Sequence, residues 1–352
     1  MNPADLIKRY SIASSMSATD EYAANVEAIN FSLRKELFLH TRFKQAMLQI
    51  AELHAYSQHN SVGGGLLITG PSGVGKTTIL QQYLQNFPRQ QEKYITIIPV
   101  LHVVTPASPT VKSLAESILI ALGDPLARRG SAEEKTFRIY QLLKSCQVEL
   151  LLIDEFQHCY YAHSIVEYRR VADWLKNVIS ISGAAVVLLG LEEAEMVIAS
   201  NEQLARRFSA RLHITAFRFE HQEDFQEFRA VLKGYQQSLV IQPEEPLFEA
   251  NLARRFLVAS HGLIDYVRKI LEGATVVAGC AGLPKLDLTT YAAAFRKDVW
   301  PSVPDRLNPF HLESPLRKLD RPGEPYHLCG KHHAIGSPLA RRSISKPVRQ
   351  GD

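Results

Sequence analysis

A glycine-rich loop is the clearest candidate for chemistry in this sequence. It matches the pattern G-x-x-x-x-G-K-[ST] and reads Gly70-Pro71-Ser72-Gly73-Val74-Gly75-Lys76-Thr77, followed by Thr78. Its glycines let successive backbone N–H groups curl around a phosphate at a helix N-terminus, where the helix dipole favours anions. We expect Lys76 to reach the β- and γ-phosphates and the Thr77 hydroxyl to bind Mg²⁺. The loop therefore predicts a site for ATP and Mg²⁺.

Two adjacent acidic residues end an apolar segment further along the chain. Leu150-Leu151-Leu152-Ile153 runs directly into Asp154 and Glu155. At the carboxyl end of a buried strand, Asp154 can hold the shell of Mg²⁺, and Glu155 can polarise the water that attacks the γ-phosphate. A solvated strand end is the alternative interpretation, but the position of the pair after a phosphate loop favours ATP hydrolysis.

Alternating strands and helices are expected to position these motifs. Strands are predicted at 65–69, 94–104, 149–153, 184–189 and 213–219, and helices at 76–86, 110–122, 134–145, 168–179 and 192–207. Apolar runs without polar alternation, such as 150–153 and 184–189, are typical of parallel strands that helices cover on both faces. The expected fold class is α/β, a P-loop NTPase with a central parallel sheet.

Four parts are expected along the chain. Residues 1–60 are predicted as a helical extension with helices at 26–37 and 42–56, residues 61–220 as the nucleotide-binding domain and residues 221–300 as a helical lid. Residues 301–352 hold eight of the 18 prolines, interleaved with cations. That composition predicts a mostly disordered, basic tail.

Charge and composition exclude several classes of protein. The chain has 352 residues and a net charge of +4, and residues 1–300 carry 31 Lys and Arg against 31 Asp and Glu. A neutral body argues against a general polyanion binder, although it leaves room for a local basic stripe. No apolar run is long enough to span a bilayer, and the four cysteines show no Cys-x-x-Cys spacing. We expect a cytoplasmic protein without a membrane segment.

The sequence resembles the AAA+ ATPases. The resemblance rests on the two motifs, on the helical lid and on the run Gln203-Leu204-Ala205-Arg206-Arg207-Phe208. The resemblance implies an arginine finger, a cation that enters the ATP site of a neighbouring subunit, with Arg207 the first candidate and Arg206 the second. The alternative is an arginine pair that ends a helix favourably at its negative end.

Two positions depart from the AAA+ pattern. The strand at 184–189 runs into Gly190-Leu191, where many members place a polar residue that orients water. Arg268, the weak candidate for the phosphate sensor of the lid, stands six residues after Gly262 rather than near the third. We therefore expect slow hydrolysis, and an arginine finger supplied by a neighbouring subunit makes it depend on assembly.

A closer resemblance is to the TniB/TnsC family, the ATP-dependent regulators of heteromeric DNA transposons, including CRISPR-associated ones. Besides the phosphate loop, it rests on residues 105–112 and 119–125, on Ile153-Asp154-Glu155-Phe156-Gln157-His158 and on residues 203–208. It implies a homo-oligomeric ring or spiral that forms on double-stranded DNA with ATP. It also implies partners, namely a TniQ-like target selector and a TnsB-type transposase, with a TnsA-type endonuclease as a further candidate.

The same resemblance implies that residues 105–112 contact DNA. Lys112 is the expected phosphate contact, and Thr105 and Thr110 are the expected hydroxyl donors. The alternative for this segment is an ordinary helix N-cap at Ser108 or Thr110.

Two other functions stay open at this point. One is a secretion or cell-envelope ATPase of the same superfamily, which usually carries membrane or wall-binding segments. The other is a nucleotide-gated scaffold for which ATP is only a structural ligand.

Overall fold

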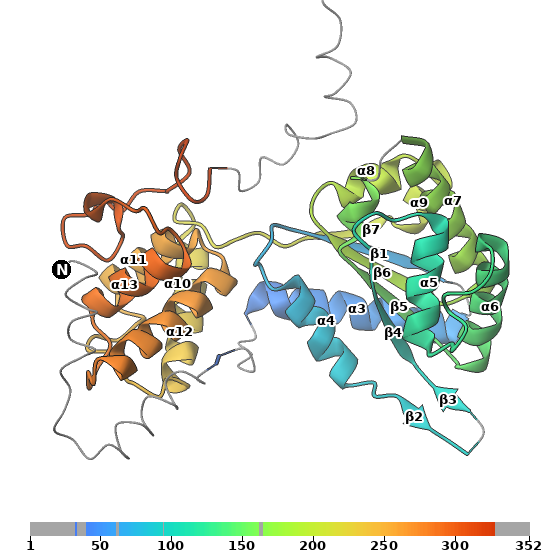
Figure 1. Ribbon diagram of the computed structural model, residues 1–352, viewed down its shortest axis with the longest axis horizontal. Helices are drawn as coiled ribbons and strands as arrows, with labels where there is room; N and C mark the ends of the chain where they lie inside the picture. Colours follow the sequence, from blue (N-terminus) through green and yellow to red (C-terminus); the bar gives the residue numbers. More distant parts are fainter. Residues whose placement is uncertain (1–31, 34–39, 61–62, 94, 162–164, 328–352) are drawn as a thin grey trace, which may run out of the picture. The chain divides into compact units, whose positions relative to one another are not determined.

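The computed structural model describes residues 32–33, 40–60, 63–93, 95–161 and 165–327, and these fall into two compact units. One unit comprises the described residues between 42 and 215 (Figure 1). The other combines residues 216–327 with the short described parts before residue 42. Among the described residues, no helix combines the length and apolar composition that a membrane crossing requires.

A five-stranded parallel sheet forms the centre of the first unit. Its strands follow the order β4-β5-β6-β1-β7 and span β1 (Gly65–Thr69), β4 (Val100–Val104), β5 (Leu150–Asp154), β6 (Ala185–Gly190) and β7 (Ala210–His213). In this register Thr69 pairs with Gly190, and Val104 pairs with Asp154. The carboxyl ends of these strands therefore meet at one edge, where the phosphate loop and the acidic pair follow.

Helices cover both faces of this sheet. They are α3 (Thr41–Asn60), α4 (Lys76–Gln85), α5 (Val111–Leu122), α6 (Ala132–Ser145), α7 (Ile165–Ser182), α8 (Ala194–Ala199) and α9 (Glu202–Arg207), with the 3-10 helix η1 (Phe156–Cys159) and a small antiparallel pair, β2 (Gln90–Gln91) and β3 (Thr96–Ile97). Figure 1 shows α3 and α4 on one side of the sheet and α5, α6 and α7 on the other. Strands β1, β5 and β6 are buried at every position, which confirms the predicted parallel sheet and its fold class.

The α/β unit begins before the predicted boundary at residue 61. Helix α3 buries Phe43, Ala46 and Ile50, and the Ser57 hydroxyl donates a hydrogen bond to the Gly183 carbonyl. The prediction of a helix at 42–56 is confirmed, whereas most of the predicted helix at 26–37 lies outside the described residues.

Three predicted elements differ from the structure. The helix predicted at 192–207 is divided into α8 and α9, because the Asn201 side chain accepts a hydrogen bond from the Leu204 amide and caps a new helix. The strand predicted at 94–104 is interrupted before β4, near Pro99, which has no N–H for a ladder bond. The strand predicted at 213–219 is instead β7, which ends at His213.

The second unit is helical. It contains α10 (Gln222–Gln237), α11 (Ala250–Ser260), α12 (Ile264–Cys280), α13 (Leu288–Asp298) and the 3-10 helix η2 (Asp305–Leu307). Phe228, Phe256, Ile270 and Phe295 are fully buried in its core, one from each of the four α-helices. The helices thus bury their apolar faces against one another.

Residues 301–327 pack into this helical core, which corrects the prediction that the disordered tail starts at residue 301. Val303, Phe310, Leu319 and Tyr326 are at most 6% exposed. The buried Arg255 guanidinium also donates hydrogen bonds of 2.7 Å to the carbonyls of Pro309 and His311. Apart from η2 the segment has no helix or strand, but widely spaced apolar side chains still pack it against the core. Residues 328–352 lie outside the described part of the chain.

Candidate functional site

The phosphate loop has the backbone that anion binding requires. Gly75 adopts a left-handed conformation with φ 102°, and it immediately precedes Lys76, the first residue of α4. Any other residue type is strained at that φ, so the glycine is required by the turn. The first N–H groups of α4 have no partner within the helix and face this turn, as in a phosphate-binding site.

The ammonium of Lys76 lies inside the loop. Its Nζ donates hydrogen bonds to the Gly70 carbonyl at 2.8 Å and the Pro71 carbonyl at 3.0 Å. Burial lowers the pKa of Lys76, and the negative charges of Glu155 and Asp154 partly offset that effect. The hydrogen-bond partners of this buried cation among the described residues are two neutral carbonyls, so it favours a nearby anion, which a nucleotide phosphate can supply.

The structure brings together the two residues predicted to hold Mg²⁺. The Thr77 hydroxyl donates a hydrogen bond to Asp154 Oδ2 at 3.0 Å, and Asp154 Oδ1 accepts the Glu155 amide at 2.8 Å. Asp154 is buried, whereas Thr77 and Thr78 are exposed. A carboxylate and a hydroxyl at one point fit Mg²⁺, which prefers oxygen ligands and completes its shell with phosphate oxygens and water.

Glu155 sits directly after β5 in a left-handed conformation, with φ 56°. Such a conformation is uncommon for a residue with a side chain and often occurs where function requires it. The Glu155 Oε2 atom accepts a hydrogen bond from Gln157 Nε2 at 2.5 Å and lies 3.8 Å from His158 Nε2. Within the described residues, the second oxygen of this half-exposed carboxylate has no hydrogen bond. That oxygen is available to a water molecule.

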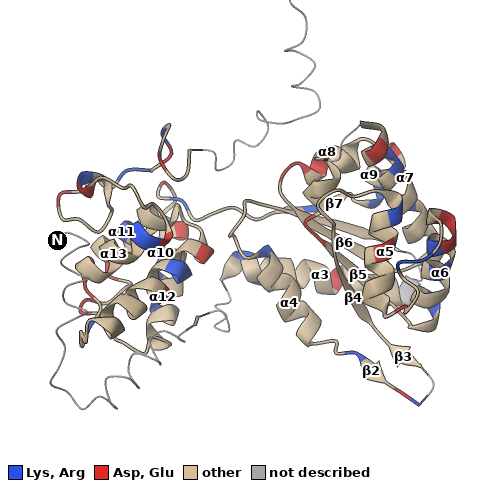
Figure 2. Cartoon of the chain, viewed as in Figure 1, with Lys and Arg blue, Asp and Glu red and all other residues tan. Residues whose placement is uncertain are grey.

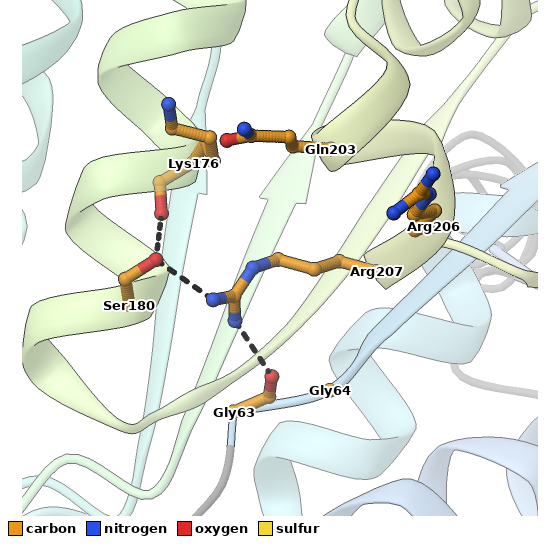
Figure 3. A pocket seen from close by; sticks show the side chains of 7 residues that line it. All are labelled: Gly63, Gly64, Lys176, Ser180, Gln203, Arg206 and Arg207. Atoms are coloured by element: carbon orange, nitrogen blue, oxygen red, sulfur yellow. Dashed lines mark hydrogen bonds between the residues drawn. The ribbon is translucent and has the colours of Figure 1, made fainter.

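Arg206 and Arg207 lie at the opposite edge of the sheet from the phosphate loop. They line an open hollow of about 620 Å³, here called the amino-edge hollow. Its lining residues are Gly63, Gly64, Lys176, Ser180, Gln203, Arg206 and Arg207 (Figure 3). Gly63 and Gly64 precede β1 and the phosphate loop follows it, so the five residues of the strand place the two regions roughly 17 Å apart. Neither arginine therefore reaches the phosphate loop of its own subunit.

The two arginines differ in their partners. Arg207 donates to the Ser180 hydroxyl at 2.8 Å and to the Gly63 carbonyl at 3.3 Å, as the dashed lines in Figure 3 show. The Arg206 side chain is 75% exposed and forms an ion pair of 2.6 Å with Glu202, one turn earlier in α9. In the part of the chain that the structure describes, the Lys176 ammonium has no hydrogen bond or ion pair. Arg207 thus connects the elements that line the hollow, whereas the charged groups of Arg206 and Lys176 are accessible to a ligand.

The three candidate DNA contacts have different environments. Thr105 is 2% exposed, so its hydroxyl does not reach a DNA phosphate in this conformation, which argues against that prediction. Thr110 caps α5: its hydroxyl accepts the Ser113 amide at 3.1 Å, and the Ser113 hydroxyl accepts the Thr110 amide at 2.8 Å. The N-cap alternative is therefore confirmed for Thr110. Lys112 is exposed in the first turn of α5.

Three cations surround Glu116 on the face that carries Lys112. Lys135 lies 2.9 Å from Glu116 and is fully buried, whereas Arg128 lies 3.9 Å away and its side chain is 86% exposed. The hydrogen bond from Lys135 lowers the pKa of Glu116 most, and the charges of Arg128 and Lys112 lower it further. Figure 2 shows an acidic position on α5 and basic positions on the segment that joins α5 to α6. The face therefore holds a local excess of positive charge.

Two other arginines form ion pairs within their own helices. Arg268, the weak candidate for a phosphate sensor, pairs with Asp265 at 2.6 Å and Glu272 at 2.7 Å within α12. Arg170 pairs with Glu167 at 2.8 Å on the exposed face of α7. Gln157 follows the acidic pair by two residues, and no local sequence pattern indicates that its side chain turns back to Glu155.

A model of the bacterial TniB protein family matches residues 29–217. Over 235 residues the chain is 23% identical to general secretion pathway protein A of Aeromonas hydrophila. That alignment covers 64% of this chain and 39% of the relative, so the chain spans about two fifths of that protein's length.

Solved structures share the fold. The ORC2 protein of Aeropyrum pernix, in ADPNP–ADP complexes, aligns with a TM-score of 0.58 at 15% identity, covering 77% of this chain and 72% of its own. Cdc6p of Pyrobaculum aerophilum gives 0.58 at 13% identity, with 80% and 73% covered. The A. pernix ORC1 protein in complex with DNA gives 0.55 at 13%, with 78% and 69% covered. At these identities the likeness shows the fold alone.

Proposed function

Because the chain belongs to the TniB family and has the AAA+ P-loop fold, we propose that it is an ATP-dependent regulator of DNA transposition. In this proposal, subunits with bound ATP assemble on double-stranded DNA as a ring or spiral and bridge a target selector to the transposase. ATP hydrolysis then dismantles the assembly.

The meeting of Lys76, Thr77, Asp154 and Glu155 at one edge of the sheet is the observation that carries the ATPase proposal. The loop amides and Lys76 bind the phosphates. Thr77 and Asp154 would hold Mg²⁺, which would neutralise phosphate charge. Glu155 orients a water molecule through its unpaired oxygen and accepts the proton that the water loses. A bond forms from this water to the γ-phosphorus as the bond to the β–γ bridging oxygen breaks.

The amino-edge hollow supports hydrolysis across a subunit interface. We assign the role of arginine finger to Arg206 ahead of Arg207, because Arg207 is already bound to Ser180 and Gly63. An exposed ion pair such as Arg206–Glu202 contributes only about 0–1 kcal/mol, so a phosphate can replace it. Lys176 adds a second cation on the same hollow.

Lys112 and Arg128 support the proposal of DNA binding. Both side chains are exposed, and both act on the same carboxylate, which Lys135 already neutralises. Each subunit of a ring would present this pair to the DNA backbone, and backbone contacts carry no sequence information. The TniQ-like selector, the TnsB-type transposase and the TnsA-type endonuclease are assigned as partners from the family.

Electron microscopy and phosphate release test this function together. The protein is imaged with duplex DNA and a slowly hydrolysed ATP analogue, and phosphate release is measured with and without DNA. Rings or filaments that need both ligands, with release that DNA stimulates, support the proposal. Isolated subunits under all conditions contradict it.

The match to general secretion pathway protein A favours a second candidate, an ATPase of a secretion system. Such a protein needs no DNA to assemble or to hydrolyse ATP. Assembly and phosphate release that DNA leaves unchanged would favour this candidate. Assembly with DNA but without any phosphate release would instead favour a nucleotide-gated scaffold.

A further inference from the structure

We propose that Gln157 is the positioning residue of Glu155, and that it supplies from the neighbouring loop the polar group that the end of β6 lacks. The proposal rests on the proposed ATPase function of Glu155. It concerns how the carboxylate is held, and it does not depend on DNA binding or on any partner protein.

The Gln157 side chain connects two strands at the carboxyl edge of the sheet. Gln157 belongs to η1, which follows β5, and its side chain is buried, with 4% exposed. Its Nε2 donates to Glu155 at 2.5 Å, and its Oε1 accepts the Leu191 amide at 3.1 Å, just after β6. Both ends of a buried amide are thus partnered, one by backbone and one by the carboxylate assigned to water activation.

These two partners fix which way the amide faces. Only an oxygen can accept the Leu191 N–H, so the nitrogen must face Glu155. A flipped amide would place two donors together at Leu191 and an oxygen against the carboxylate. Glu155 therefore receives a donor with one defined geometry, and a hydrogen bond to an ionised group is among the stronger ones. The bond holds one carboxylate oxygen and leaves the other to the attacking water.

Gly190 makes this arrangement possible. A Cβ on residue 190 would lie 2.6 Å from Gln157 Oε1 and 3.1 Å from the Gln157 backbone nitrogen. A polar side chain at the end of β6 and the Gln157 amide therefore compete for one space. Residues 190 and 191 have no polar side chain, and the Gln157 side chain of η1 occupies the place where one would lie.

Two substitutions separate this role from a structural one. Gln157→Glu keeps an oxygen for the Leu191 amide but replaces the donor with an oxygen that repels Glu155. Gly190→Ala displaces the Gln157 amide and changes no titratable group. We expect each to lower kcat for ATP hydrolysis about 10- to 100-fold, a part of what a general base contributes, while the Kd for ATP changes less than about twofold.

Two combinations show whether the effect passes through the proposed residues. In a Gln157→Ala background the side-chain oxygen at 2.6 Å is gone and only the contacts of 3.1 Å and 3.3 Å remain, so Gly190→Ala should add less than about a twofold loss. In a Glu155→Gln background, Gln157→Glu should add nothing further to the loss of kcat. Gln81→Glu, the same change at an exposed position of α4, controls for the added charge.

The outcomes distinguish this proposal from the function it rests on. If the wild-type protein releases no phosphate, or if Glu155→Gln releases it at the wild-type rate, the proposed function fails. If Glu155→Gln is inactive but Gln157→Glu and Gly190→Ala both hydrolyse normally, only the positioning role fails. A loss of ATP affinity or of folding without a change in kcat also overturns it. If Gln157→Glu does not fold, the comparison of Gly190→Ala in the wild-type and Gln157→Ala backgrounds decides whether Gln157 positions Glu155.

Discussion

At the carboxyl edge of the sheet, carboxylates and hydroxyls gather around one buried lysine, whereas at the amino edge three cations line an open hollow without a carboxylate among its lining residues. The first region can bind a nucleotide and activate water, and no arginine of the α/β unit pairs with Lys76, Asp154 or Glu155 in the described part of the chain. The second offers arginine with no nucleotide site beside it. The two regions complement each other only between different copies of the chain, so we expect catalysis to require assembly.

Lys76→Ala has the largest expected effect, because it removes the buried cation from the nucleotide site at the carboxyl edge. Losing charge-assisted bonds to two phosphates should weaken ATP binding about 100-fold or more, and assembly on DNA should be lost with it. Binding of a fluorescent ATP analogue and electron microscopy measure both effects. Lys44→Ala, an exposed position in α3, is the matched control. If Lys76→Ala still assembles on DNA in an ATP-dependent way, the assignment of residues 70–77 as the phosphate loop is wrong.

Glu155→Gln should leave the carboxyl edge able to bind ATP but unable to activate water. We expect kcat to fall about 100- to 1000-fold, within the range of general-base contributions, and complexes on DNA to last longer. Single-turnover phosphate release and the lifetime of DNA complexes are the measurements. A variant that hydrolyses ATP at the wild-type rate would show that another group activates the water.

Arg206→Ala tests whether the amino edge acts on a neighbouring copy. We expect hydrolysis by the assembled protein to fall about 10- to 100-fold, less than for a sole arginine finger, because Lys176 remains. ATP binding by the free subunit should not change. Mixing Arg206→Ala with Lys76→Ala should restore part of the activity, since some interfaces then pair an intact loop with an intact arginine.

Arg207→Ala in the same mixing experiment decides between the two arginines. Its loss removes the bonds that join α9 to Ser180 of α7 and to Gly63 before β1, so the variant subunit itself should be less stable and mixing should restore little. Rescue of Arg207→Ala but not of Arg206→Ala would reverse our assignment.

Lys112→Ala should have the smallest effect, on DNA binding alone. Each phosphate contact contributes about 0.9 to the slope of log affinity against log salt on B-form DNA, so the slope should flatten by about that amount for each subunit bound. ATP binding by the free subunit serves as the control. A truncation after His327 tests the contribution of the remaining basic segment. A truncation after Trp300 would also remove Phe310 and Tyr326, which belong to the helical core. If only the truncation changes the slope, the DNA contact is not Lys112.

The sequence predicts the carboxyl edge better than the amino edge for a physical reason. The phosphate loop and the acidic pair are local patterns whose strand and helix neighbours can be read beside them, and Thr77 and Asp154 do meet. The partners of Arg207 are 27 and 144 residues away in the chain, so no local pattern reveals that it is bound.

Other features depend on tertiary packing in the same way. The burial of Thr105 and the turn of Gln157 toward Leu191, 34 residues later, follow from packing at the sheet edge. The folding of residues 301–327 depends on single apolar anchors and on Arg255, which a composition rich in proline conceals. The break at Asn201 was predictable, because asparagine is a common N-cap.

The three cations around Glu116 also affect how the surface exchanges ions with the solvent. One carboxylate cannot neutralise Lys112, Arg128 and Lys135 together, so this face attracts anions from the buffer before any DNA arrives. DNA that binds here displaces those anions as well as the cations condensed along its own backbone. The affinity for DNA should therefore depend on the kind of anion as well as on ionic strength, and should be higher in glutamate salts than in chloride at equal concentration.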